Sequence, residues 1–192
     1  PPEGVRRALR RKPFRYDEAP SRQLRFAARS LAEHRDFSAR WTRGDFDREA
    51  RIDAVMTRLA SLGRLSENAF RPTSRLAQHF QDMNRFVEEI LLRERAMEER
   101  DYDGVEAELK DLKRRRSWTY KGFGDDYAEG VSRDEALKMR DDVKTDLDAF
   151  VEDVDADLAA RLQEDLGPAI AGYEQLKERE GRLDFLDLLI RV

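Results

Sequence analysis

The sequence of 192 residues contains no cysteine and only two histidines, His34 and His79. The absence of cysteine excludes disulfides, thiolate nucleophiles and cysteine-based zinc sites. Neither histidine stands in an E-x-x-H or H-E-x-x-H pattern, so the common histidine–carboxylate metal motifs are absent as well. We therefore predict no metal-ligating residue, and we interpret both histidines as surface or packing residues.

Motifs of catalysis and nucleotide binding are also missing. No serine lies in a G-x-S-x-G elbow, and the phosphate loop G-x-x-x-x-G-K-[ST] is absent. The segment Gly122-Phe123-Gly124 begins like a dinucleotide fingerprint, but the third glycine does not follow. We predict no catalytic residue and no cofactor held by this chain itself.

Long apolar runs are lacking too. No stretch of about eighteen apolar residues occurs, which excludes a transmembrane helix. The basic start, PPEGVRRALRRKPFRY, lacks the apolar core of a signal peptide. We therefore expect a cytoplasmic protein with no membrane partner. Because the sequence starts with Pro1 and stops inside the apolar run LDLLIRV, we expect it to be a fragment of a larger protein.

Charge, by contrast, is abundant and segregated. Charged residues make up 41% of the chain, and the net charge is −4. Residues 1–48 carry thirteen Arg or Lys against seven Asp or Glu, a net charge of +6, whereas residues 124–165 carry fifteen acids against five bases, a net charge of −10. A further basic island lies at residues 110–121. Segregated charge creates local potentials that the net charge hides, although many such residues only line solvated helix faces.

Apolar residues recur at intervals of three and four along most of the chain, which is typical of amphipathic helices. The pattern predicts helices over residues 21–34, 45–62 and 103–116, a helix of more than twenty residues after Pro72, and a long helix from residue 132. The predicted N-terminal caps are Ser21, Thr73, Asp103 with Glu106, and a capping box of Ser132 with Glu135. Gly167-Pro168 is expected to break or kink the long helix, and Gly181 to end the next one. We predict an all-α fold, an irregular helical bundle with one or two long helices.

One segment suggests a polyanionic partner. Residues 117–131 have three glycines, four aromatic residues and no helical period, so they predict an aromatic loop. Basic residues immediately precede it, and cations hold phosphates while exposed aromatic rings stack on unpaired bases. The candidate DNA-binding residues are Lys113, Arg114, Arg115, Arg116, Trp118, Tyr120 and Lys121, with Arg6, Arg7, Arg10 and Arg11 as a second patch. The alternative remains that the bases satisfy a helix dipole and the rings pack on the bundle.

The C-terminal segment resembles a known family. Tyr173 to Val192, YEQLKEREGRLDFLDLLIRV, is similar to a stretch of UvrD/Rep-type superfamily 1 DNA helicases, in which a Y-x-x-x-K helix leads into an L-D-F-D-D-L-L motif. Here that motif reads LDFLDLL over residues 183–189, and the apolar Leu186 in place of Asp resembles the AddA/RecB-like branch. The basic run before Trp118 and the stretch EHRDFSARWTRGDF from Glu33 to Phe46 are similar to that branch as well.

This resemblance implies a particular place in a larger enzyme. Residues 1–182 would form the helical accessory subdomain 1B, and residues 183–192 would begin the return to motor subdomain 1A. The parent would be an ATP-dependent DNA helicase, requiring ATP and Mg²⁺ at a site outside this chain, with a recombination-repair nuclease as a candidate partner subunit. The chain itself would contact DNA, single-stranded or at a junction, beside the motor. A helical protein–protein interaction module without DNA binding is the alternative hypothesis, and a free-standing enzyme has the least support.

Overall fold

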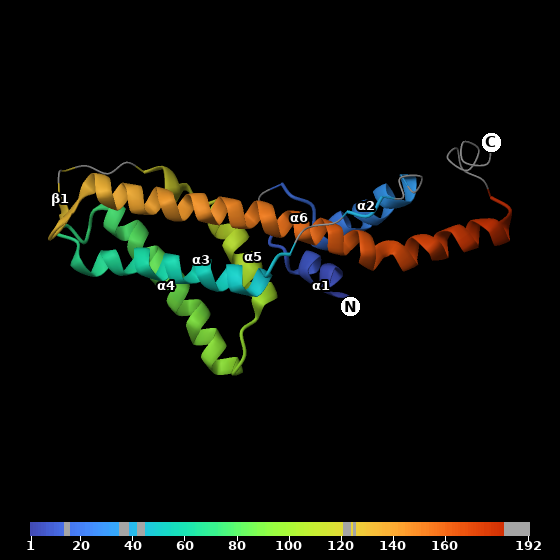
Figure 1. Cartoon of the computed structure of the whole chain (residues 1–192), viewed down its shortest axis with the longest axis horizontal. Coiled ribbons are helices and arrows are strands. Elements are labelled where there is room, and N and C mark those ends of the chain that lie inside the picture. The colour runs from blue at the N-terminus through green and yellow to red at the C-terminus, as the bar shows by residue number, and fades with distance from the viewer. Residues whose placement is uncertain (14–15, 35–38, 42–44, 121–123, 125, 183–192) are drawn as a thin grey trace. The chain divides into compact units, whose positions relative to one another are not determined.

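The computed structural model describes residues 1–13, 16–34, 39–41, 45–120, 124 and 126–182 (Figure 1). It confirms the all-α prediction, since helices dominate and the described strands form one short hairpin. The chain divides into two compact units. Unit 1 comprises Pro1–Phe46 and Asp155–Val192, and unit 2 comprises Asp47–Val154. The long helix α6, Arg133–Glu180, contributes its first part to unit 2 and its remainder to unit 1.

In unit 2, side-chain caps fix where the helices begin. The helices are α3 (Arg48–Arg64), α4 (Arg75–Met97) and α5 (Tyr102–Lys113), and the short 3-10 helix η1 (Leu65–Asn68) follows α3. The caps are Asp47, Ser74 and Asp101, whose side-chain oxygens accept hydrogen bonds from backbone N–H groups three residues further on. Each cap satisfies an N–H group that has no acceptor within its helix.

In unit 2, two predicted caps were misplaced by one or two positions. The cap of α4 is Ser74 rather than Thr73, and the cap of α5 is Asp101 rather than Asp103. Asp103 lies instead in the first turn of α5, buried, where its carboxylate accepts a hydrogen bond from Arg48. Neighbouring residues of similar capping ability cannot be separated by sequence, because tertiary contacts select among them.

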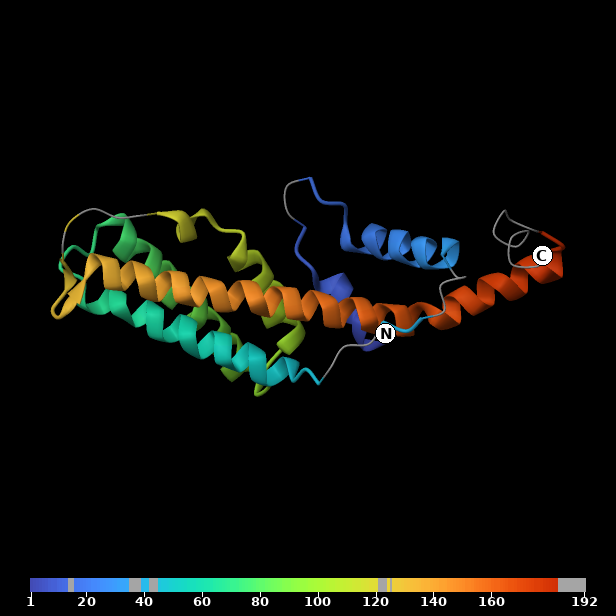
Figure 2. The ribbon, with the colours of Figure 1, turned by 45° about the horizontal axis from the view of Figure 1, so that its top comes forward.

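The core of unit 2 lies between α3, α4, α5 and the first part of α6. Each helix buries one apolar stripe, and the residues with essentially no exposed surface include Ile52, Leu59, Phe80, Leu109, Leu147 and Phe150. Ion pairs from Arg51 to Asp153 and from Arg58 to Asp146 join α3 to α6, and the two helices run side by side in Figures 1 and 2. Helices α3 and α4 approach so closely that a Cβ atom added to Gly63 would lie 2.8 Å from the Asn84 Cα atom.

The predicted aromatic loop contains local structure. It includes the 3-10 helix η2 (Arg116–Thr119) and an antiparallel hairpin of β1 (Asp126–Ala128) and β2 (Val131–Ser132). Tyr127 is buried in this hairpin, and its ring packs edge-on against Phe80, with the ring centroids 5.4 Å apart. Directly after the hairpin the predicted capping box is confirmed, since Ser132 and Glu135 exchange backbone-to-side-chain hydrogen bonds at the start of α6.

The helix does not break at Gly167-Pro168, because α6 continues through Pro168 to Glu180; of the two predicted outcomes, a kink stays a prediction. A proline removes one hydrogen-bond donor and crowds the preceding turn, but the neighbouring turns keep their own hydrogen bonds, so one proline can be accommodated. Gly181 ends the helix as predicted. Its φ of +64° is the left-handed conformation that glycine adopts readily.

Unit 1 contains two short helices and the second part of α6. Helix α1 (Glu3–Arg10) was not predicted, whereas α2 (Pro20–Glu33) agrees closely with the predicted helix over residues 21–34. The predicted cap Ser21 is wrong, because α2 begins after Ala19 and Ser21 lies inside the helix. Helix α1 contacts α6 closely, because a Cβ atom added to Gly4 would lie 3.0 Å from the Arg161 Cβ atom. The N–H group of Val5, in the first turn of α1, donates a hydrogen bond of 3.1 Å to the carboxylate of Asp165. A capping group from a distant part of the chain cannot be read from local sequence.

Candidate nucleic-acid interface

The predicted basic segment begins at the C-terminal end of α5. Lys113 pairs with Asp148 at 3.5 Å, and Arg115 pairs loosely with Asp111 at 3.7 Å while its guanidinium lies over the ring of Phe86. Arg114, Arg115 and Arg116 are all exposed. Cations at the end of a helix interact favourably with its dipole, so part of this cluster serves the fold. The exposed guanidiniums nevertheless present positive charge to solvent.

The position of Trp118 differs most from the predicted site. The sequence predicted an exposed ring that stacks on bases, but Trp118 is only 5% exposed. Its indole N–H donates a hydrogen bond of 2.8 Å to the backbone carbonyl of Leu112, near the end of α5. The short helix η2 turns the indole inward, and this burial satisfies both the apolar ring and its polar N–H group. Trp118 is therefore a core residue and offers no face to a base.

Tyr120 lies differently from Trp118. It is partly exposed, and the guanidinium of Arg75 lies 5.9 Å from the centre of its ring. Its backbone carbonyl accepts a hydrogen bond from the buried Arg140, which fixes the chain at this point against α6. His79 packs edge-on against the same ring. Tyr120 is thus held at the surface by polar contacts from two helices.

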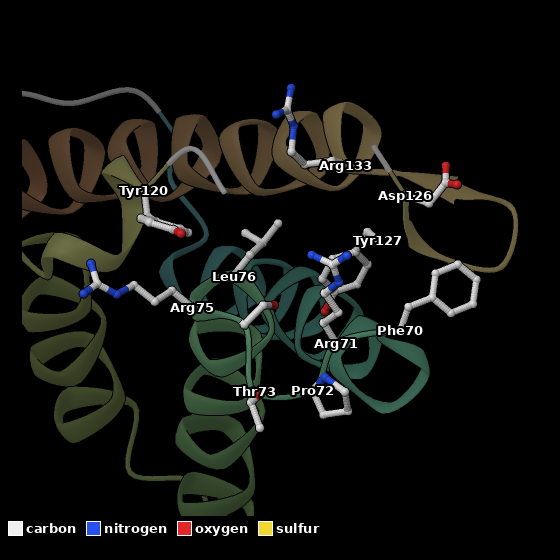
Figure 3. Close-up of a pocket in the computed structure, with 11 residues that line it drawn as sticks. Phe70, Arg71, Pro72, Thr73, Arg75, Leu76, Tyr120, Asp126, Tyr127 and Arg133 are labelled. Carbon is white, nitrogen blue, oxygen red and sulfur yellow. The ribbon is translucent and has the colours of Figure 1, made fainter. Parts of the chain in front are cut away.

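A pocket of about 500 Å³ adjoins Tyr120 (Figure 3). Its walls come from the segment before α4, the first turn of α4, the hairpin and the start of α6. The lining residues are Phe70, Arg71, Pro72, Thr73, Ser74, Arg75, Leu76, Tyr120, Asp126, Tyr127 and Arg133. A backbone hydrogen bond from Phe70 to the carbonyl of Tyr127 ties two of these walls together. Of the predicted DNA-binding residues, Tyr120 is the one that lines this pocket, together with Arg71, Arg75 and Arg133.

Sequence reasoning missed Arg71, Arg75 and Arg133. They are scattered singly along the chain, and no local cluster marks them. Among the described residues, neither Arg71 nor Arg75 forms an ion pair, whereas Arg133 contacts the neighbouring Asp134 at 2.6 Å. The one signal available in the sequence was Pro72 directly after Arg71, which marks a turn before a helix.

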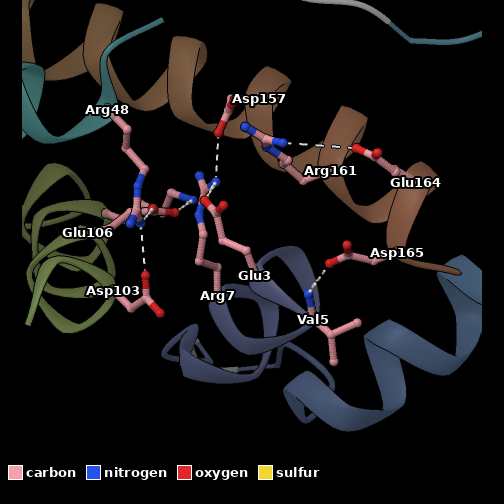
Figure 4. A network of polar contacts seen from close by, with 11 residues as sticks. Glu3, Val5, Arg7, Arg48, Asp103, Glu106, Asp157, Arg161, Glu164 and Asp165 are labelled. Atoms are coloured by element: carbon pink, nitrogen blue, oxygen red, sulfur yellow. Dashed lines mark hydrogen bonds and ion pairs between the residues drawn. The ribbon is translucent and has the colours of Figure 1, made fainter. Parts of the chain in front are cut away.

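The N-terminal patch lies in unit 1 and is only partly at the surface (Figure 4). Arg7 is 2% exposed and is held by Asp157 at 2.6 Å and by Glu3 at 3.2 Å. This burial argues against the predicted contact of Arg7 with DNA, because its guanidinium is covered and neutralised by two carboxylates. Arg11 lies 3.7 Å from Asp155, while Arg6 and Arg10 are exposed. Part of the charge segregation in the sequence thus reflects packing of basic α1 against acidic α6.

A second buried ionic cluster stabilises unit 2. Arg48 donates hydrogen bonds of 2.9 Å to Asp103 and to Glu106, and Lys110 contacts Glu106 at 2.7 Å (Figure 4). Burial disfavours the charged guanidinium, but the hydrogen bonds and charges of the two carboxylates outweigh it and raise the pKa of Arg48. These charges satisfy one another, so we assign the cluster a structural role.

Lys121 and residues 183–192, including the LDFLDLL motif, lie outside the described residues. Within the described part of the chain, no three His, Asp or Glu side chains converge as metal ligands. Nor does any described helix combine the length and apolar character that crossing a bilayer requires.

Comparisons with protein-family models, curated proteins and solved structures find no match.

Proposed function

We propose that this chain is a DNA-contacting accessory subdomain of an ATP-dependent DNA helicase of the UvrD/Rep type, acting in repair or recombination. The helicase assignment rests on the sequence resemblance at residues 173–192. In this proposal the parent's motor subdomains bind ATP and Mg²⁺, and a nuclease subunit is a candidate partner. The chain contributes positive charge and aromatic surface that hold DNA beside the motor.

The observation that carries DNA contact is the junction at Tyr120. There Tyr120, four residues after the exposed Arg116, lines the pocket together with Arg71, Arg75 and Arg133. Among the described residues, Arg71, Arg75 and Arg116 are exposed and form no ion pair, so their charge is available to phosphates. Phosphate contacts of this kind supply affinity without sequence preference, which suits a protein that works on any DNA.

The proposal is tested by binding of the chain to a labelled single strand and to a strand–duplex junction at low salt. The variant Arg71→Ala/Arg75→Ala/Arg116→Ala is expected to lose most of its affinity, because each arginine that contacts a phosphate contributes to counterion release. The matched control is Arg22→Ala/Arg25→Ala/Arg29→Ala, which removes three exposed charges from α2. Equal loss in both variants, or no binding by the unmodified chain, would contradict the proposal.

The alternative function is a helical protein–protein interaction module. One observation favours it: Leu92 and Met97, near the end of α4, are 66% and 54% exposed. Exposed apolar side chains on one helix end are suited to packing against a partner helix. Under this alternative, the chain self-associates stably and binds no DNA, and Leu92→Glu/Met97→Glu abolishes the association. A monomer by analytical ultracentrifugation that binds DNA would exclude it.

A further inference from the structure

The pocket beside Tyr120 combines features that a simple backbone-tracking surface does not need. It is a hollow of about 500 Å³, which is within the range of sites that hold small organic ligands. Its lining joins cationic, hydroxyl and aromatic side chains from five parts of unit 2, including Tyr120. Such a combination recognises a compact anion that carries an apolar or aromatic group.

The cationic side of the pocket is suited to a phosphate. In Figure 3, Arg71 lies in the middle of the group, Arg75 extends away from it toward Tyr120, and the Arg133 side chain points away from both. The first turn of α4, from Arg75, forms one wall, and the leading N–H groups of a helix have no acceptor within the helix. Guanidiniums and a helix N-terminus together favour an anion with several acceptor oxygens.

A buried hydroxyl independently indicates a ligand. Tyr127 lines the pocket and is 5% exposed, yet its hydroxyl has no hydrogen-bond partner among the described residues. Burial raises the pKa of Tyr127 to about 12, so the hydroxyl keeps its proton and can donate it in a hydrogen bond. Buried polar groups are nearly always satisfied, and a bound oxyanion would supply the missing acceptor.

The aromatic side of the pocket is suited to a base. Phe70, at one edge of the pocket, is 60% exposed. Tyr120, which also lines the pocket, is partly exposed. Large exposed rings beside a phosphate site offer stacking surfaces, which every nucleobase can use. A phosphorylated peptide would need no such rings, so the lining favours a nucleotide.

We propose that this pocket binds a phosphomonoester carried on a nucleotide, with the phosphorylated end of a DNA strand as its source. The inference rests on the proposed DNA-contacting function and adds a specificity for strand ends. A terminal phosphate carries close to two negative charges near neutral pH, whereas an internal phosphodiester carries one. The Arg71 guanidinium in the middle of the pocket, with Arg75 on its Tyr120 side, therefore attracts the end more strongly than the backbone.

The test compares three forms of one labelled single strand: 5′-phosphorylated, 3′-phosphorylated and hydroxyl-ended. We expect at least one phosphorylated form to bind about tenfold more tightly than the hydroxyl form, because charge-assisted hydrogen bonds are the stronger kind. The variant Arg71→Ala/Arg75→Ala should abolish this ratio. Arg116→Ala is the matched control, since Arg116 lies outside the pocket and its loss should weaken all three strands while keeping the ratio.

Tyr127→Phe gives a second, independent variant. It removes only the unpartnered hydroxyl and keeps the ring that packs on Phe80, so the unfolding free energy should be unchanged or higher. The ratio between phosphorylated and hydroxyl-ended strands should fall several-fold. A Tyr127→Phe chain that keeps the full ratio would remove the hydroxyl from the site.

The outcomes separate this inference from the proposed function. Equal binding of all three strands overturns the inference and leaves DNA contact standing. If no strand binds, the proposed function fails, and titration of the chain with thymidine monophosphate, followed by NMR, decides the inference. Shifts that disappear in Arg71→Ala/Arg75→Ala then support a phosphomonoester site for a free nucleotide. An unperturbed spectrum overturns it.

Discussion

Replacing Trp118 tests whether this residue belongs to the core or to the DNA surface. Trp118→Ala removes a side chain that is 95% covered, and truncations of buried aromatic residues cost about 3–5 kcal/mol of unfolding free energy. Trp118→Phe keeps an aromatic ring and removes the indole N–H that donates to Leu112. The Leu112 carbonyl also accepts from the Arg115 N–H at 3.1 Å, so it retains a partner. We therefore expect Trp118→Phe to cost about 0.5–1.5 kcal/mol.

The assay is urea unfolding followed by circular dichroism, combined with DNA binding of each variant that remains folded. Trp118→Phe should bind DNA as the unmodified chain does, because the indole is covered in the folded protein. Circular dichroism avoids confusion with the fluorescence of Trp41, which remains in every variant. The reasoning would be refuted by a Trp118→Ala chain that unfolds with unchanged free energy and yet loses its affinity for DNA.

Two further predictions concern packing and pH. Gly63→Ala should destabilise the chain by about 1–3 kcal/mol, because its Cβ atom would meet the Asn84 backbone at 2.8 Å; Gly172→Ala, which meets nothing within 4 Å in the same kind of helix, should stabilise it slightly. Equal changes in the free energy of unfolding for the two variants, measured in urea, would contradict the close approach of Gly63 to Asn84. Burial, with the charges of Arg140 and Arg75, lowers the pKa of His79 below 6.5. At a pH between the pKa of His79 in the folded chain and its higher pKa in the unfolded chain, the unfolded chain binds more protons. The free energy of unfolding is therefore highest above pH 6.5 and falls as the pH drops toward the folded pKa. Replacing His79 by glutamine should flatten that dependence, and an NMR titration of His79 at or above 6.5 would contradict it.

The features that sequence predicted well are those set by local chemistry. The apolar stripes of α3, α4 and α6 follow helical spacing because each helix buries one face. The capping box of Ser132 with Glu135 was equally local, since both partners lie within one turn. Helix α1 escaped prediction because its stability depends on Arg7 and Gly4 packing against α6, which is remote in sequence.

The candidate site was less predictable, because side-chain exposure is decided by tertiary packing. The cluster before Trp118 was visible as charge, but whether the indole faced solvent depended on η2 turning it toward Leu112. In the same way, the thirteen basic residues of the N-terminal region indicated a polyanionic partner, whereas Arg7 finds its acids within the chain. Arg71 and Arg133 line the same pocket although they are 62 positions apart in the sequence, a separation that no local sequence motif spans.

The most direct test of the central claim is the salt dependence of binding to a labelled single strand. If Arg71, Arg75 and Arg116 each hold a phosphate, the logarithm of the binding constant should fall against the logarithm of salt concentration with a slope of about −2, since each contact contributes about −0.7. The triple alanine variant should bring that slope close to zero. Binding that is independent of salt, or a slope that the triple variant leaves unchanged, would contradict DNA contact through this surface.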